Sequence, residues 1–171
     1  RRIGLFVLLA GIGACGHPGV GTAQQASATR PPWNLPADQF VTVDGWRVHY
    51  YERGTGPALV LVHGFSGSAG LEWGRVIDHL AVGHRVIALH VPGFAPSDIP
   101  DGPYDSEALV ARLGATLSAL DARNVTLVGE SFGGWLAATY GDRLLAARRE
   151  GNREAILEFE KSGSQSALVI E

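Results

Sequence analysis

The sequence predicts an α/β fold with a mostly parallel sheet and flanking helices, and three largely apolar runs carry this prediction. The runs cover residues 58–62, 85–91 and 124–128, and a glycine follows each of them within two residues. Runs without polar alternation are typical of parallel strands that are covered on both faces. With 46% hydrophobic and 18% charged residues, the 171-residue chain is suited to one folded domain and not to a disordered chain.

A hairpin is predicted ahead of these runs. Residues 40–43 and 46–52 alternate between apolar and polar positions, and Asp44-Gly45 separates them. Asp-Gly between two such segments is a strong signal for a tight β-turn. The prediction is therefore an incomplete sheet of about five strands, with Ser166–Ile170 as a possible sixth.

Two stretches between the apolar runs have helical spacing. Their apolar residues recur at intervals of three and four, which places them on one face of a helix. Asp105 or Ser106 is a suitable N-cap for the second stretch. The residues are Trp73, Val76, Ile77 and Leu80 in the first stretch, and Leu109, Leu113, Leu117 and Leu120 in the second. Strands that alternate with helices predict right-handed crossovers within a parallel sheet.

The N-terminus resembles an export signal. Arg1-Arg2 precede twelve apolar or small residues, 3–14, a run too short to cross a bilayer as a helix. Two processing sites are open: before Cys15, as in a bacterial lipoprotein signal, or after Ala23, as in a secreted protein. We favour the lipoprotein, because the sole cysteine directly follows the apolar run. The expected localisation is the bacterial cell envelope, or else the periplasm or the medium, with residues 1–23 as signal and 24–39 as linker.

Charge and cysteine content exclude several classes of function. The chain has 14 basic and 17 acidic residues, so it lacks the basic excess that nucleic-acid binding requires. One cysteine excludes a disulfide framework and a cysteine-based zinc site. We therefore expect no cofactor, no metal and no nucleic acid, and membrane contact only through a lipid on Cys15.

A G-x-S-x-G motif carries the candidate chemistry. Gly129-Glu130-Ser131-Phe132-Gly133 directly follows the third apolar run and precedes a stretch compatible with a helix. In a strand–turn–helix setting this motif is a nucleophile elbow, in which the serine occupies a strained turn. Gly129 and Gly133 are expected to let the strand and the helix approach closely. Ser131 is the candidate nucleophile.

Three further motifs precede the elbow, and together the four resemble the α/β-hydrolase family across residues 43–140. They are the hairpin region 44–57, the loop motif at 61–65 (LVHGF) and the strand and loop at 85–98. Ser131 is similar to the nucleophile of the esterase, lipase and carbon–carbon hydrolase branches, because epoxide hydrolases and dehalogenases have Asp there. Ala95 departs from the family pattern, which usually has a small residue, often glycine, at that position.

The resemblance implies roles for several residues around the nucleophile. The oxyanion hole would use the backbone N–H groups of Phe65 and Phe132. His63 would order its turn through hydrogen bonds. His90 stands where the family usually has Asp, and we interpret it as a strand-end residue and not as a base. Phe65, Phe132 and Trp135 are open to two interpretations, an acyl pocket or plain core.

The general base of the family is absent from this sequence. In this fold the acid and the histidine follow the serine along the chain, whereas all six histidines here precede Ser131. The resemblance fades after Tyr140, and residues 141–161 hold ten of the 31 charged residues. We therefore expect residues 40–140 to be the amino-terminal part of a hydrolase domain and 141–171 to be a divergent charged helical tail. A truncation, a frameshift and a genuine short protein remain open.

Two functions follow. The first is a serine hydrolase of small ester-like or similar carbonyl substrates, of which this chain lacks the catalytic acid and histidine. The second is a non-catalytic envelope lipoprotein that uses the same scaffold to bind a ligand or partner.

Overall fold

The computed structural model describes residues 33–149. Its elements are β1 (Gln39–Val43), β2 (Trp46–Arg53), β3 (Ala58–Val62), α1 (Ala69–Trp73), α2 (Ile77–Leu80), β4 (Arg85–Leu89), α3 (Ser106–Ala119), β5 (Thr126–Gly129) and α4 (Phe132–Arg149). The predicted signal segment with Cys15 and the possible sixth strand at Ser166–Ile170 lie outside the described residues.

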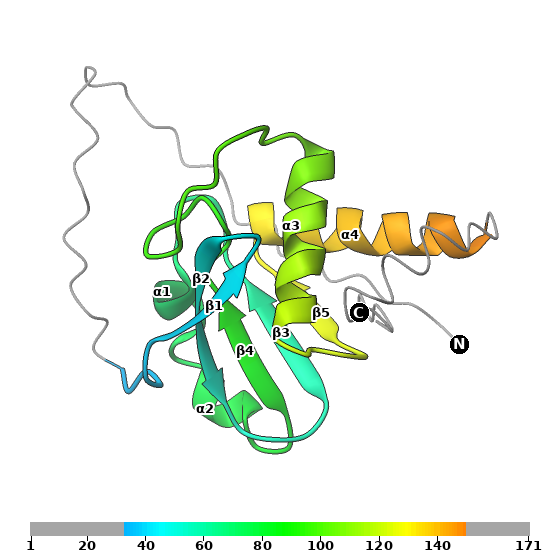
Figure 1. Cartoon of the computed structure of the whole chain (residues 1–171). Helices are drawn as coiled ribbons and strands as arrows, with labels where there is room; N and C mark the ends of the chain where they lie inside the picture. Colours follow the sequence, from blue (N-terminus) through cyan, green and yellow to red (C-terminus); the bar gives the residue numbers. More distant parts are fainter. Residues whose placement is uncertain (1–32, 150–171) are drawn as a thin grey trace, which may run out of the picture.

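The described strands form a mixed sheet in the order β1-β2-β4-β3-β5, drawn in Figure 1. β3 pairs in parallel with β4 on one side and with β5 on the other, whereas β2 pairs antiparallel with β1 and β4. The predicted parallel core and opening hairpin are thus confirmed. Val62 lies opposite both Leu89 and Gly129, so the three parallel strands end at the same level.

The hairpin turn has the geometry that its sequence requires. Val43 pairs with Trp46 across the two-residue loop. Asp44 and Gly45 have φ angles of +49° and +88°. Two consecutive left-handed residues match the right-handed twist of the flanking strands, which explains the Asp-Gly pair.

Helices cover both faces of the sheet (Figure 1). Val60 and Val62 of β3 belong to the core cluster that α3 and α4 complete. Leu59 and Leu61 point to the other face, where Ile77 of α2 belongs to the same cluster. Every residue of β3 is therefore buried, as the unbroken apolar run predicted.

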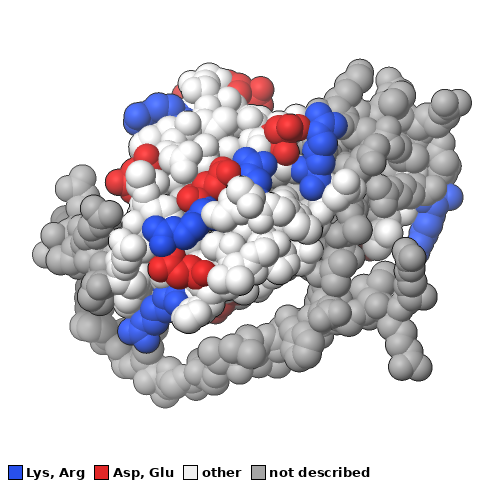
Figure 2. Space-filling view, turned by 90° about the horizontal axis from the view of Figure 1, so that it is seen from below, with Lys and Arg blue, Asp and Glu red and all other residues white. Residues whose placement is uncertain are grey.

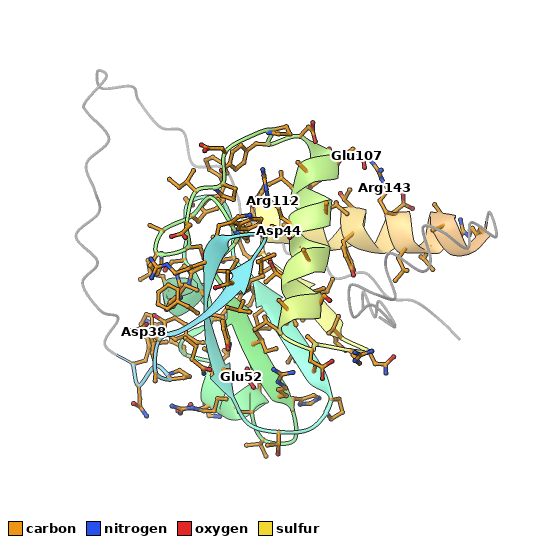
Figure 3. All side chains as sticks on the ribbon, in the orientation of Figure 1. Asp38, Asp44, Glu52, Glu107, Arg112 and Arg143 are labelled. Atoms are coloured by element: carbon orange, nitrogen blue, oxygen red, sulfur yellow. The ribbon has the colours of Figure 1, made fainter. Side chains whose placement is uncertain are left out.

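α3 and α4 pack against each other on one face. Asp105 caps α3, because its side chain accepts the N–H of Ala108 at 2.9 Å. Figure 3 shows Glu107 of α3 beside Arg143 of α4, and the two form an ion pair. α4 continues beyond Tyr140 to Arg149. The first part of the expected charged tail is thus a continuation of this helix.

The predicted helix around Trp73 is divided. α1 ends at Trp73 and α2 begins at Ile77, with Gly74 between them. The indole of Trp33 packs against Gly74 between the two helices. Its Nε1–H donates to the Gly70 carbonyl at 2.7 Å, and a Cβ on Gly74 would lie 1.8 Å from Nε1. A contact across 37 residues therefore shapes the helix ends.

The described part of the expected linker packs on the domain. Leu35 is 4% exposed and belongs to the core cluster with Ile77. Asp38, at the edge of the sheet in Figure 3, accepts a hydrogen bond from His49 at 3.0 Å. Residues 33–38 are thus part of the folded domain.

Basic and acidic side chains are interspersed on the face shown in Figure 2. Arg85 of β4 and Glu52 of β2 form one ion pair, at 2.8 Å. Between residues 33 and 149, no helix has the length and apolarity needed to cross a bilayer.

Candidate active site

Ser131 occupies a strained turn between β5 and α4. β5 ends at Gly129, α4 begins at Phe132, and Ser131 between them has a φ of +48°. The N–H of Trp135 donates to the Ser131 carbonyl at 3.0 Å and so starts the helix. Ser131 is exposed at the carboxyl end of the parallel strands. A serine in the left-handed region at this point has the geometry of a nucleophile elbow.

The two glycines of the motif are required by backbone contacts. A Cβ on Gly129 would lie 2.3 Å from the carbonyl of Gly133. A Cβ on Gly133 would lie 2.2 Å from the carbonyl oxygen of Val62. Neither contact can be relieved by a side-chain rotation, because the opposing atoms are backbone. The close approach expected of Gly129 and Gly133 is therefore present.

The loop after β3 lies next to the elbow. The N–H of Glu130 donates to the Val62 carbonyl at 3.1 Å, which joins the turn to the end of β3. The rings of Phe65 and Phe132 are edge to face at 5.9 Å. The structure thus brings together the two residues expected to supply the oxyanion hole.

Aromatic rings extend from this loop to α4. Phe94 contacts both Phe65 and Phe132, at 5.5 and 5.8 Å. Trp135 stacks on Phe132 at 5.6 Å. Phe65 is 73% exposed and Trp135 43%, so these two side chains are not core residues. They form an apolar surface beside Ser131, which favours the first of the two interpretations.

His63 has a structural role. Its Nδ1–H donates to the Gly64 carbonyl at 2.7 Å, and its Nε2 accepts the N–H of Val91 at 3.2 Å. Burial lowers the pKa of the ring. A neutral imidazole with both nitrogens engaged has no free lone pair for the proton of Ser131. The predicted ordering of the turn by His63 is confirmed.

Two further buried histidines, His49 and His90, lie next to His63, whose ring is 5.6 Å from that of His90. The Nδ1 atoms of His49 and His90 are 2.8 Å apart, and Nε2 of His49 bonds Asp38. The Ser97 hydroxyl donates to the His90 carbonyl and accepts the N–H of His49. Burial, followed by the neighbouring His49 and His63, lowers the pKa of His90 to about 3. His90 is thus a neutral structural residue; its pairing with His49, 41 residues away, left no local signal in the sequence.

Two carboxylates beside the loop were not predicted. Glu72 of α1 accepts the N–H of Gly64 at 2.8 Å. Glu130 places Oε2 against the same glycine, because a Cβ on Gly64 would lie 1.9 Å from that oxygen. Within residues 33–149, the structure shows no histidine hydrogen-bonded to the Ser131 hydroxyl.

The model of the alpha/beta hydrolase fold family matches residues 57–144, which are 88 of the 171 residues. The chain belongs to the α/β hydrolase fold family. The match extends from the start of β3 through the elbow and into α4. It therefore contains Ser131 and the loop with His63 and Phe65.

Curated relatives from this family have different activities. The chain is 37% identical over 114 residues to a 2-hydroxy-6-oxo-2,4-heptadienoate hydrolase of Pseudomonas putida, covering 64% of this chain and 41% of the relative. It is 33% identical over 108 residues to a soluble epoxide hydrolase of Corynebacterium, covering 62% and 37%. The chain thus spans about two-fifths of the length of these relatives.

Solved structures with a similar fold also have longer chains than this one. A bacterial membrane phospholipase A has a TM-score of 0.59 and 34% identity, with 63% of this chain and 35% of that chain covered. An epoxide hydrolase from an endophytic Streptomyces has a TM-score of 0.57 and 34% identity, with 66% and 34% covered.

Proposed function

We propose that this chain carries the nucleophile and the oxyanion hole of a serine-type hydrolase that acts on an ester or similar carbonyl substrate. The observation that supports this most is the backbone of Ser131, held at φ +48° between β5 and α4. A strained, exposed serine at the start of a helix has no evident structural benefit and suits a nucleophile. Serine at this position also favours acyl chemistry over the epoxide chemistry of some relatives.

The proposed reaction begins with attack of the Ser131 Oγ on the carbonyl carbon. The carbonyl oxygen becomes an oxyanion, which the N–H groups of Phe65 and Phe132 stabilise. A general base takes the hydroxyl proton and passes it to the leaving group. Water then attacks the acyl-enzyme and releases the acid, which regenerates Ser131.

The base is not found among the residues of this sequence. All six histidines precede Ser131, and both ring nitrogens of His63 are engaged. We propose that a histidine and an acid outside these 171 residues complete the site. Loss of such a base lowers turnover by about 10⁶-fold in well-studied serine enzymes, so we expect only slow chemistry from this chain alone.

Covalent labelling tests the assignment of Ser131. We expect an alkyl fluorophosphonate to label the wild-type chain slowly, because the base is missing, and to label Ser66→Ala at the same slow rate, since Ser66 is an exposed serine of the neighbouring loop. Ser131→Ala is expected to remain unlabelled. Labelling of Ser131→Ala at the wild-type rate would remove Ser131 from the proposed role.

The alternative is a non-catalytic binding protein, which the absence of a base favours. On this view the aromatic surface beside Ser131 holds a ligand that is not turned over. A chain that binds an apolar ester and releases no product, with Ser131→Ala binding equally well, would support it. We also propose that the protein is exported and anchored by a lipid on Cys15, which the pattern of residues 1–15 supports.

A further inference from the structure

Glu72 reaches back from α1 to the loop that carries Phe65. Its Oε2 accepts the N–H of Gly64 at 2.8 Å. Its Oε1 lies against Gly67, where a Cβ would be only 1.6 Å away. The carboxylate therefore spans the two glycines on either side of the loop apex.

This contact is not an ordinary helix cap. Ser68 is the N-cap of α1, and its side chain accepts the N–H of Leu71 at 3.3 Å. A capping box would place the acidic side chain at Leu71, three residues after the cap. Glu72 lies one residue later, and its carboxylate bonds a loop amide eight residues earlier in the chain.

The bonds around Gly64 fix the peptide unit that contains the Phe65 N–H. The Gly64 carbonyl accepts from Nδ1 of His63 at 2.7 Å and from the N–H of Gly67 at 3.3 Å. A trans peptide is planar, so the Phe65 N–H points opposite to this carbonyl. Glu72 holds the preceding peptide through the Gly64 N–H. Both sides of Gly64 are thereby tied down, which leaves the loop little freedom to rotate the Phe65 N–H.

Glu130 contacts the same glycine from the elbow. Its Oε2 lies against Gly64, and its backbone N–H bonds the Val62 carbonyl. Burial, with a smaller contribution from the charge of Glu130, raises the pKa of Glu72, while the bond to Gly64 lowers it. A second carboxylate next to Glu72 disfavours its charged form, and the bond to the Gly64 N–H offsets part of this cost.

We propose that Glu72 is a positioning residue of the candidate active site, which sets the direction of the Phe65 N–H by holding the amide of Gly64. This inference rests on the proposed function of Ser131 and Phe65. A charged acceptor holds an amide about twice as strongly as a neutral one. The glutamine variant therefore keeps part of the effect, and the alanine variant loses it.

Two measurements on the full chain test this. The first is the amide resonance of Gly64 by NMR, which we expect to move upfield in Glu72→Gln and further in Glu72→Ala, with Gly83 unchanged. The second is the fluorophosphonate labelling rate of Ser131. Loss of an oxyanion donor costs about 10²–10³-fold, so a misdirected donor is expected to slow labelling at least tenfold in Glu72→Ala. Glu72→Gln is expected to lie between, about threefold slower, and Glu107→Gln on α3 to label like wild type.

The outcomes separate the inference from the function on which it rests. Labelled wild type with an unchanged rate in Glu72→Ala overturns the role of Glu72 and leaves that of Ser131 intact. If wild type does not label, as the missing base allows, the Gly64 amide decides, and an unchanged resonance in Glu72→Ala overturns the inference without touching the role of Ser131. If Glu72→Ala does not fold, Glu72→Gln decides alone, and a wild-type rate in that variant overturns the inference.

Discussion

Gly133 lies so close to Val62 that a Cβ on the glycine would be 2.2 Å from the valine carbonyl oxygen. The first turn of α4 is thereby pressed against the end of β3. This contact decides where Ser131 stands relative to the loop after β3, because Ser131 is only two residues before Gly133. Any side chain at position 133 would therefore force the backbone of α4 or of β3 to shift.

We therefore expect Gly133→Ala to destabilise the chain by about 2–3 kcal/mol, despite the better helix propensity of alanine. Urea unfolding followed by circular dichroism measures this. Gly134→Ala is the matched control, because its Cβ would meet its nearest backbone atom at 3.0 Å. Equal stability of the two variants would show that the strand and helix can separate without cost.

Relief of backbone strain at Ser131, the candidate nucleophile, is the second prediction. Glycine adopts positive φ without penalty, whereas alanine keeps the strain of Ser131. We expect Ser131→Gly to be more stable than Ser131→Ala by about 1 kcal/mol. The same two substitutions at exposed Ser66, where φ is not positive, are expected to reverse this order. Equal stabilities at position 131 would mean that the elbow stores no strain.

Acid sensitivity is the third prediction. The pKa values of His49, His63 and His90 are all lowered, that of His90 to about 3, chiefly by burial. Below pH 6.5, these three histidines become protonated in the unfolded chain, whereas they stay neutral in the folded chain. Stability is therefore full above pH 6.5 and falls as the pH drops towards 3, by up to about 1.4 kcal/mol per unit for each histidine.

Urea midpoints between pH 7 and pH 4 measure this slope. His90→Gln is expected to flatten it, and His79→Gln, which changes an exposed histidine of α2, is expected to leave it unchanged. A wild-type midpoint that stays constant from pH 7 to pH 5 would contradict the burial of neutral rings.

The fourth prediction concerns the segment before β1. Leu35 is 4% exposed in the cluster between α2 and the sheet. Leu35→Ala is expected to cost about 2–4 kcal/mol of unfolding free energy, whereas exposed Asn34→Ala is expected to change it little. Should both variants match wild type, residues 33–38 would behave as a tether and not as part of the core.

Lipid attachment is the fifth prediction. Expression in a bacterial host with labelled palmitate is expected to label the wild-type protein and not Cys15→Ser, because the sole cysteine follows the apolar run directly. Mass spectrometry of the mature N-terminus distinguishes the alternatives. A product that begins at Gln24 and carries no label would establish the secreted form.

Much of this fold was predictable because its signals are local. Residues 58–62 form a strand with the predicted bounds, and Asp44-Gly45 forms the predicted turn. The elbow around Ser131 was likewise predictable, since the G-x-S-x-G motif occupies consecutive residues directly after a predicted strand. Local sequence signals were thus sufficient to predict both the main strands and the turn that carries Ser131.

The remainder depends on contacts between distant residues. Trp33 divides the helical stretch around Gly74, although the two lie 41 positions apart. Glu72 and the His49–His90 pair are likewise defined by partners that only the folded sheet brings near. Spacing along the chain carries no information on such side-chain directions. The side chains that hold the candidate site in place could therefore not be predicted, although the turn with Ser131 could.

The place of β5 at the edge of the described sheet has a consequence for dynamics. In residues 33–149, β5 pairs with β3 alone, whereas β3 and β4 each have two neighbours. Strands that are held on one side open more often than central ones, and such local opening is visible as faster amide hydrogen exchange. Ser131 directly follows this strand, so we expect its turn to open while the centre of the sheet stays closed. Reactivity at Ser131 is then expected to disappear on warming before the protein as a whole unfolds.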